Sequence, residues 1–159
     1  MPERFRPDSI NTSILALYCD YEFVPNNTLF LLRLKDKVFA KIMALSVNSI
    51  VYLTDFYLFK QEATYGYTHI KATDFVLFHV LNAKELTKRV KDELLELFEK
   101  CRKIAFPSII DQLTEQFPTR VEIDSTILRI LGLTEKEIHE WLPKLYSLLA
   151  KELQTKGRV

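Results

Sequence analysis

The sequence predicts an α+β fold, in which short strands pack around one long central helix and a four-helix part follows. The first observation behind this is the apolar stretch 38–59, which is long enough for a central helix. The second is that residues 1–37 alternate short apolar runs with turn residues. The third is a succession of helix start and stop signals from residue 82 onward. We therefore expect two parts, a mixed strand and helix subdomain over 1–82 and a helical subdomain over 83–159.

The central stretch 38–59 would span roughly 33 Å as one helix. Lys41, Asn48 and Asp55 lie inside it, and ionisable groups are costly at the centre of a bilayer. We therefore expect a core helix and no membrane span, with Asn48 and Ser49 marking a polar seam or a bend. Its apolar positions recur at helical spacing, at Phe39, Ile42, Met43, Ile50, Leu53 and Tyr57.

Four segments have the composition of short strands. Before the central helix these are residues 14–18, 21–24 and 28–34, with a turn at 25–27. After the helix, residues 69–80 begin with alternating polar and apolar side chains.

Residues 60–68, KQEATYGYT, are predicted to form a loop or a hairpin tip. A lysine for phosphate, two tyrosines for stacking and a glycine for close approach suit a nucleic-acid surface. The same residues also fit an ordinary surface loop with a tyrosine folded back onto the domain. Composition alone leaves both interpretations open.

Helix signals mark the second half of the chain. Asn82 with Glu85 resembles a capping box that starts the first helix. Pro107 and Ser108 open a shorter helix, which Pro118 should end. Residues 121–131 form the next helix, which Gly132 stops.

A capping box of Thr134 and Glu137 starts the last helix. Pro143 lies inside this helix and should kink it or split it in two.

Composition and charge are those of an ordinary globular protein, with 48% hydrophobic and 27% charged residues and a net charge of +1. DNA binding would therefore depend on a local patch. Cys19 and Cys101 lack metal or redox spacing, so we expect free thiols in a reducing compartment. Residues 1–7 lack an apolar signal segment, and a cytoplasmic location is expected.

The sequence predicts no catalytic, metal or cofactor site, so we expect a protein that is not an enzyme on its own. Three glycines are too few for a glycine-rich phosphate loop or a dinucleotide fingerprint. His69 and His79 have no ligand partners at metal spacing, so a structural role is expected for each. Four acids lie close together in the sequence, and we expect them to flank helix ends, where the helix dipole commonly favours acidic side chains. They are Asp111, Glu115, Glu122 and Asp124.

Three segments carry further motifs. Residues 25–30 are PNNTLF and lead into a helix with ALSVNS at 44–49. Residues 65–75 begin with Tyr-Gly-Tyr and end with Asp-Phe, and Asn82 lies beyond them. The third segment comprises ELLELFEK at 93–100, RVEID at 120–124, Ile-Leu at 127–128, Leu-Gly-Leu at 131–133 and Leu-Tyr at 145–146.

In this order, the three segments resemble the carboxy-terminal part of the N6-adenine DNA methyltransferases of restriction–modification systems. The first is similar to the family's Asn-Thr-aromatic strand and to its helix with a Leu-Asn-Ser motif, although Val47 replaces the leucine. The second is similar to the loop and strand after that helix, with fewer glycines. The third is similar to the family's tail, where an aspartate and a Leu-Gly-Leu turn precede a final helix. The resemblance covers most of residues 25–150.

The resemblance implies a non-catalytic DNA-recognition portion, either a fragment or a standalone protein. The family's catalytic domain has a glycine-bearing loop for S-adenosylmethionine and an Asn/Asp-Pro-Pro-aromatic tetrapeptide for the flipped adenine, and neither occurs in this sequence. The implied partners are duplex DNA near the target base and a methyltransferase catalytic domain or subunit. On DNA, phosphate contacts would fix the register and a few side chains would contact base edges.

The predicted DNA-binding residues lie mainly in the loop after the central helix. They are Lys60, Tyr65, Tyr67, Thr68 and Lys71, with Arg4, Arg6 and Arg33 as secondary candidates.

The alternative is a helical protein-interaction or scaffold domain without DNA binding. A basic, tyrosine-bearing face near residues 60–71 would favour DNA recognition. An exposed apolar stripe on the last helices would favour the alternative or a missing partner.

Overall fold

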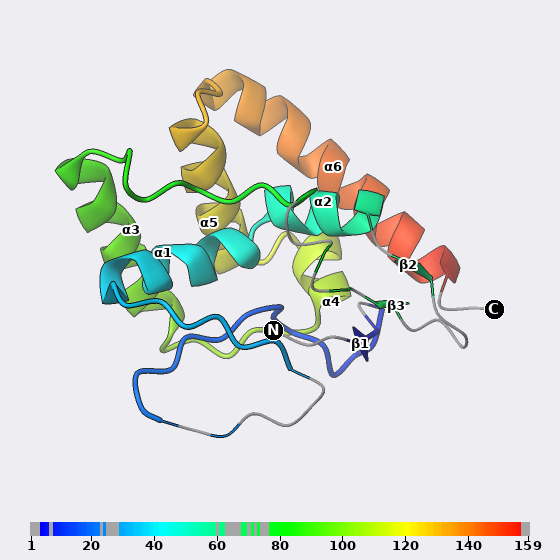
Figure 1. Ribbon diagram of the computed structural model, residues 1–159. Helices are drawn as coiled ribbons and strands as arrows, with labels where there is room; N and C mark the ends of the chain where they lie inside the picture. The colour runs from blue at the N-terminus through cyan, green and yellow to red at the C-terminus, as the bar shows by residue number, and fades with distance from the viewer. Residues whose placement is uncertain are drawn as a thin grey trace.

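The computed structural model describes residues 4–6, 8–22, 24, 29–59, 61–62, 68–69, 71, 73 and 77–156. Within this part the fold is all-α, with six helices, α1 to α6 (Figure 1). The predicted α+β class is therefore wrong.

The described strands are too short to form a layer of the core. They are β1 (Arg4–Phe5), β2 (Gln61–Glu62) and β3 (Thr68–His69), each of two residues. They pair antiparallel in the order β1-β3-β2, and both Arg4 and Gln61 lie opposite His69. The strand predicted over 69–80 is otherwise absent from its described residues.

The predicted strand 14–18 forms no strand and bends at Leu15, and a side chain supplies its hydrogen bonds. The Asn48 carboxamide oxygen accepts from Leu15 N at 2.7 Å and from Ala16 N at 3.2 Å, and Asn48 Nδ2 donates to Ala16 O at 2.8 Å. A single carboxamide therefore does here what a neighbouring strand would do. The described residues of 21–24 and 28–34 form no strand either, and several of their apolar side chains are exposed.

The predicted central helix is two helices, α1 (Lys37–Val47) and α2 (Ile50–Phe59), bent by 65°. The prediction of a single long helix is therefore wrong, and the bend expected at Asn48 and Ser49 is confirmed. The Ser49 hydroxyl donates to Ser46 O at 2.6 Å inside this bend. In the described residues no single helix could cross a membrane, while the bent pair together satisfies the length and composition of a span.

Helix α3 (Lys88–Cys101) begins later than predicted. Thr87 is its N-cap and accepts from Val90 N at 3.4 Å, so the start at Asn82 is wrong. Asn82 instead donates to Glu85 at 2.8 Å in the turn before the helix.

Ser108 caps α4 (Ile109–Thr114), as predicted. Pro118 does not end this helix but begins α5 (Pro118–Ile130), where its missing N–H leaves no helical bond unmade.

The end of α5 and the start of α6 (Glu135–Lys156) confirm the predicted signals. Gly132 has φ 100°, and Leu133 N donates to Leu128 O at 3.1 Å, as in a Schellman turn. Thr134 and Glu137 form the predicted capping box. Helix α6 continues through Pro143, so of the two outcomes predicted there, a kink or a split, the split is wrong. Buried side chains on both sides of the proline hold the helix to the core, among them Ile138, Leu142, Leu149 and Leu153.

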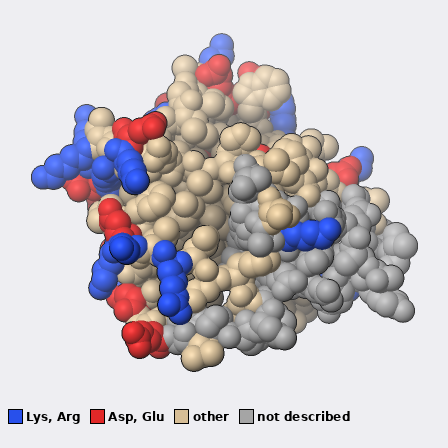
Figure 2. All heavy atoms as spheres, viewed as in Figure 1, with Lys and Arg blue, Asp and Glu red and all other residues tan. Residues whose placement is uncertain are grey.

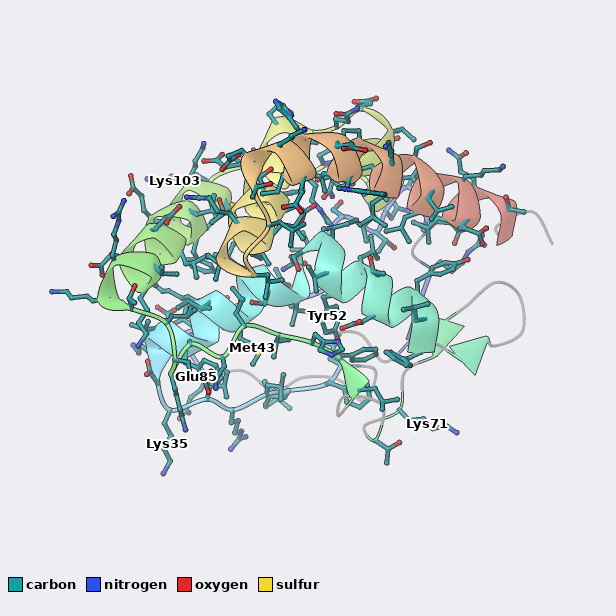
Figure 3. All side chains as sticks on the ribbon, turned by 90° about the horizontal axis from the view of Figure 1, so that it is seen from above. Lys35, Met43, Tyr52, Lys71, Glu85 and Lys103 are labelled. Carbon is teal, nitrogen blue, oxygen red and sulfur yellow. The ribbon has the colours of Figure 1, made fainter. Side chains whose placement is uncertain are left out.

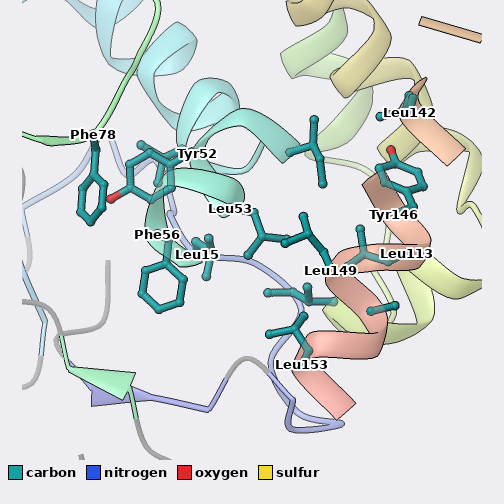
Figure 4. Packing of buried hydrophobic residues seen from close by; sticks show 14 of the residues in the cluster. Leu15, Tyr52, Leu53, Phe56, Phe78, Leu113, Leu142, Tyr146, Leu149 and Leu153 are labelled. Carbon is teal, nitrogen blue, oxygen red and sulfur yellow. The ribbon is translucent and has the colours of Figure 1, made fainter. Parts of the chain in front are cut away.

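Two clusters of buried side chains form the core. The first joins α2, α4 and α6 and contains Tyr52, Phe56, Leu113, Tyr146 and Leu149 (Figure 4). The second joins α1, α3 and α5 and contains Ile42, Leu45, Leu94, Leu97, Ile123 and Ile127. Each cluster combines residues from both sides of the boundary expected at residues 82 and 83.

Candidate functional site

The predicted DNA-binding residues are only partly described. Lys60, Tyr65 and Tyr67 lie outside the described residues. Thr68 is the first residue of β3. Lys71 is exposed, and Figure 3 shows its side chain extending away from the helices.

The pairing of β1 with β3 brings two of the predicted contacts together. Arg4 lies opposite His69, next to Thr68, although 64 positions separate Arg4 from Thr68 in the chain. Arg6 follows at the end of β1, where its guanidinium lies 2.5 Å from the Asp8 carboxylate. Arg33 is exposed in the irregular segment before α1.

Charge is mixed on the face that Figure 2 shows. Lysines, arginines and acids alternate at the edge where α1 and α3 lie, and the described centre of the face is mainly uncharged. Ion pairs account for part of this mixing, since Lys41 pairs with Glu99 at 2.7 Å and Arg102 with the same acid at 3.1 Å.

The centre of the molecule holds a polar group that the sequence analysis missed. Asp124, in the middle of α5, is fully buried. One carboxylate oxygen accepts from Ile50 N at 2.6 Å, and the other accepts from Arg120 Nε and from Tyr146 Oη, each at 2.6 Å. Asp124 therefore caps the first amide of α2 from a different helix, while the Ser49 hydroxyl accepts from Tyr52 N at 3.4 Å, and Asp124 ties α2, α5 and α6 together.

Arg120 extends this network toward the amino-terminal segment. Its Nη1 donates to Gln112 Oε1 at 3.5 Å, and Gln112 Nε2 donates to Ser13 O at 2.6 Å and to Pro107 O at 2.7 Å. The guanidinium is almost fully buried, and its Nη2 has no hydrogen-bond partner among the described residues. We refer to Gln112, Arg120, Asp124 and Tyr146 as the buried polar cluster.

Burial raises the pKa of Asp124, while the Arg120 charge and the hydrogen bonds from Tyr146, Arg120 and Ile50 oppose that rise. Burial, together with the neighbouring Asp124, raises the pKa of Tyr146, so its hydroxyl stays protonated and remains a donor. These groups can hold helices in place, and they have no access to solvent for acid–base chemistry.

A second carboxylate holds the segment after the predicted loop. Asp55 of α2 accepts from His79 N at 2.6 Å and contacts His79 Nδ1 at 2.9 Å. The His79 side chain is 78% exposed, whereas the Asp55 side chain is 11% exposed, so a buried carboxylate here meets an imidazole that is open to solvent. The structural role expected for His79 matches these contacts.

Asp124 was missed because it was grouped with acids that flank helix ends. That interpretation holds for Asp111, which accepts from the Ser108 hydroxyl in the first turn of α4. It is wrong for Asp124, which lies in mid-helix. The available signal was its position one residue after Ile123 and three before Ile127, on the apolar side of the helix.

The two cysteines are free thiols, as predicted. Burial raises the pKa of Cys101 to about 11, which keeps this sulfur protonated near neutral pH. The described residues contain no group of three or more His, Cys, Asp or Glu side chains that could hold a metal ion.

Helix α6 carries a second candidate site, because it exposes large apolar side chains. Trp141 is 57% exposed and Leu148 58%, and Leu145 lies half-buried between them on the same side of the helix. Lys144 Nζ lies 4.8 Å from the centre of the Trp141 ring. We call Trp141, Leu145 and Leu148 the α6 stripe.

Comparison with known proteins adds no assignment to either site. The chain matches no protein family model, no curated protein and no solved structure.

Proposed function

We propose that this chain is the non-catalytic recognition portion of an adenine-specific DNA methyltransferase, acting beside a catalytic domain or subunit. The proposal starts from the resemblance of residues 25–150 to the carboxy-terminal part of that family.

One observation carries the proposal, namely that the first and third motif segments meet in the core. The Val47-Asn48-Ser49 motif leads directly into Ile50, whose N–H donates to Asp124 of the third segment. The hydroxyl of Tyr146, at the end of the same third segment, donates to this carboxylate.

These motif residues also have distinct physical tasks. Asn48 holds the amino-terminal segment, Asp124 caps α2, and Gly132 ends α5 with a positive φ. A set of motifs that converges on one buried cluster is better explained by a shared architecture than by chance matches of apolar residues.

The DNA-contacting surface of this proposal is the end of the molecule where β1 and β3 pair. Arg4 is beside Thr68 there, and Lys71 is exposed nearby in the chain. Lys60, Tyr65 and Tyr67 belong to the same predicted surface. The cations would bind phosphates and the rings would stack or contact base edges.

The test is binding of a fluorescent DNA duplex at a series of salt concentrations. Each phosphate contact adds about 0.9 to the slope of log affinity against log salt concentration. We expect Lys60→Ala/Lys71→Ala to lower this slope by nearly two contacts. The matched control, Lys84→Ala/Lys103→Ala, removes the same charge from exposed positions elsewhere and should leave the slope unchanged.

Equal effects of the two double variants would contradict the proposed surface. Absence of binding at low salt, both for the chain alone and with a methyltransferase catalytic subunit added, would contradict the function itself.

The second candidate is a helical interaction domain that does not bind DNA. The specific observation in its favour is the α6 stripe, because a tryptophan exposed beside leucines is typical of a protein contact surface. A chain that associates with protein but never with DNA would establish this alternative.

A further inference from the structure

We propose that the α6 stripe binds a second copy of this chain, with the two α6 helices packed antiparallel about a two-fold axis. The inference is independent of DNA recognition, because it concerns a different surface and is tested without DNA.

The surface is apolar at its centre. Helix α6 runs along one edge of the molecule, as Figure 1 shows, and Trp141, Leu145 and Leu148 lie near its midpoint. Spacings of four and three residues place these side chains in one row on the helix. Such a row pairs well with an identical row on another helix, because each large side chain fits between residues of the facing helix.

The distribution of charge along α6 indicates that the binding partner is an antiparallel second copy of this chain. From residue 135 to 143 the helix has three glutamates and one lysine, a net charge of −2. From residue 144 to 156 it has three lysines and one glutamate, a net charge of +2. An antiparallel second copy brings each acidic half against a basic half, whereas a parallel copy would bring like charges together.

The same arrangement gives specific pairs. With the two-fold axis between residues 144 and 145, Trp141 of one copy faces Leu148 of the other. In this register Glu137 lies opposite Glu152, whose carboxylate accepts from the Tyr57 hydroxyl of its own chain at 3.0 Å, and next to Lys151 of the second copy, and symmetry repeats this arrangement. Glu137 and Lys151 are exposed, and Lys151 takes part in no ion pair within the described part of the chain.

Trp141 is the only tryptophan of the chain, so its fluorescence reports on this surface alone. On raising the protein concentration from low micromolar to submillimolar, we expect a blue shift of the emission together with a rise in mass by sedimentation equilibrium. Leu148→Glu should abolish both changes. The matched control, Leu17→Glu, alters another exposed leucine, 80% exposed, and should leave both unchanged.

A charge exchange tests the antiparallel geometry. Glu137→Lys alone and Lys151→Glu alone each place like charges together in a homodimer, and each should weaken association at least tenfold. An equal mixture of the two variants restores both attractive pairs and should associate as the original chain does. Circular dichroism of each variant verifies that α6 still folds, since Glu137 is also part of the capping box.

A chain that stays monomeric at submillimolar concentration would overturn the proposal. So would a mixture of the charge variants that associates no better than either variant alone, or equal effects of the substitutions at Leu148 and Leu17.

Discussion

Asp124 and Asp55 perform the same task in two different environments. Each carboxylate accepts a hydrogen bond at 2.6 Å from a backbone N–H of a segment remote in sequence, Ile50 N for Asp124 and His79 N for Asp55. Each also contacts a basic side chain. For Asp124 that side chain is Arg120, which is 5% exposed, and for Asp55 it is His79, which is 78% exposed.

This difference shows that a carboxylate contributes most to the stability of the fold when its basic partner is buried beside it. A buried guanidinium cannot recover its lost hydration from solvent, so removing its counterion leaves an uncompensated charge in the core. An exposed imidazole returns to water when its partner is removed. The two carboxylates should therefore contribute very differently to stability, although their backbone contacts are equally short.

The largest effect is expected for Asp124→Ala. This change leaves Arg120 without a counterion and Ile50 N and the Tyr146 hydroxyl without an acceptor. We expect a loss of about 3–5 kcal/mol in the free energy of unfolding, measured by urea denaturation. Asp92→Ala, at an exposed site on α3, is the matched control and should change stability by less than about 0.5 kcal/mol. Similar losses of unfolding free energy in the two variants would show that the buried polar cluster is not essential for the stability of the fold.

Asp55→Ala should have the second largest effect. His79 N loses its acceptor at a partly buried position, whereas the imidazole can bind water instead. We expect a loss of about 2 kcal/mol by the same urea measurement. A loss as large as that of Asp124→Ala would break the proposed distinction between the two carboxylates.

Tyr146→Phe should cost about 1–1.5 kcal/mol, because one donor to Asp124 disappears while Ile50 N and Arg120 remain. The ring, which packs in the first core cluster, is retained. Thermal unfolding followed by circular dichroism would check the value, and Tyr21→Phe at an exposed position is the control. An unchanged melting temperature for Tyr146→Phe would exclude a contribution of this hydrogen bond.

His79→Ala should have the smallest effect, below about 1 kcal/mol, since a side chain as exposed as this imidazole gains little from an ion pair. The backbone bond from residue 79 to Asp55 remains in this variant. Urea denaturation of the single and double variants at positions 55 and 79 would give the coupling energy of the pair. A coupling energy above that of the Arg120 and Asp124 pair would reverse the ranking.

The sequence predicted well where a local signal was sufficient. The start of α4 at Ser108, the end of α5 at Gly132 and the capping box of α6 all follow from residues next to the helix ends. The predicted fold class was wrong because the choice between strand and irregular backbone depends on contacts with residues remote in sequence. The apolar run at 14–18 has a composition that suits a strand, but the Asn48 side chain, more than 30 residues away, supplies its hydrogen bonds.

The buried polar cluster could not be predicted from neighbouring residues either, because it also depends on contacts between segments remote in sequence. Arg120 and Asp124 are four residues apart in α5, a spacing equally typical of a surface ion pair. Only packing against α2 and α6 determines that this pair is buried. For the α6 stripe, the sequence of the last helix contains Trp141 and Leu148 next to Leu142 and Leu149, and periodicity alone does not separate the exposed residues from the buried ones.

The cap on Ile50 has a consequence for the dynamics of the chain. The first amide of a helix usually exchanges its hydrogen with solvent quickly, because it lacks a partner within the helix. The Ile50 amide instead binds a fully buried carboxylate from α5, so its exchange requires α5 to separate from α2. Opening of that kind disrupts both core clusters, and the Ile50 amide should therefore exchange only through global unfolding. One amide signal at the beginning of a helix would then report the stability of the whole molecule.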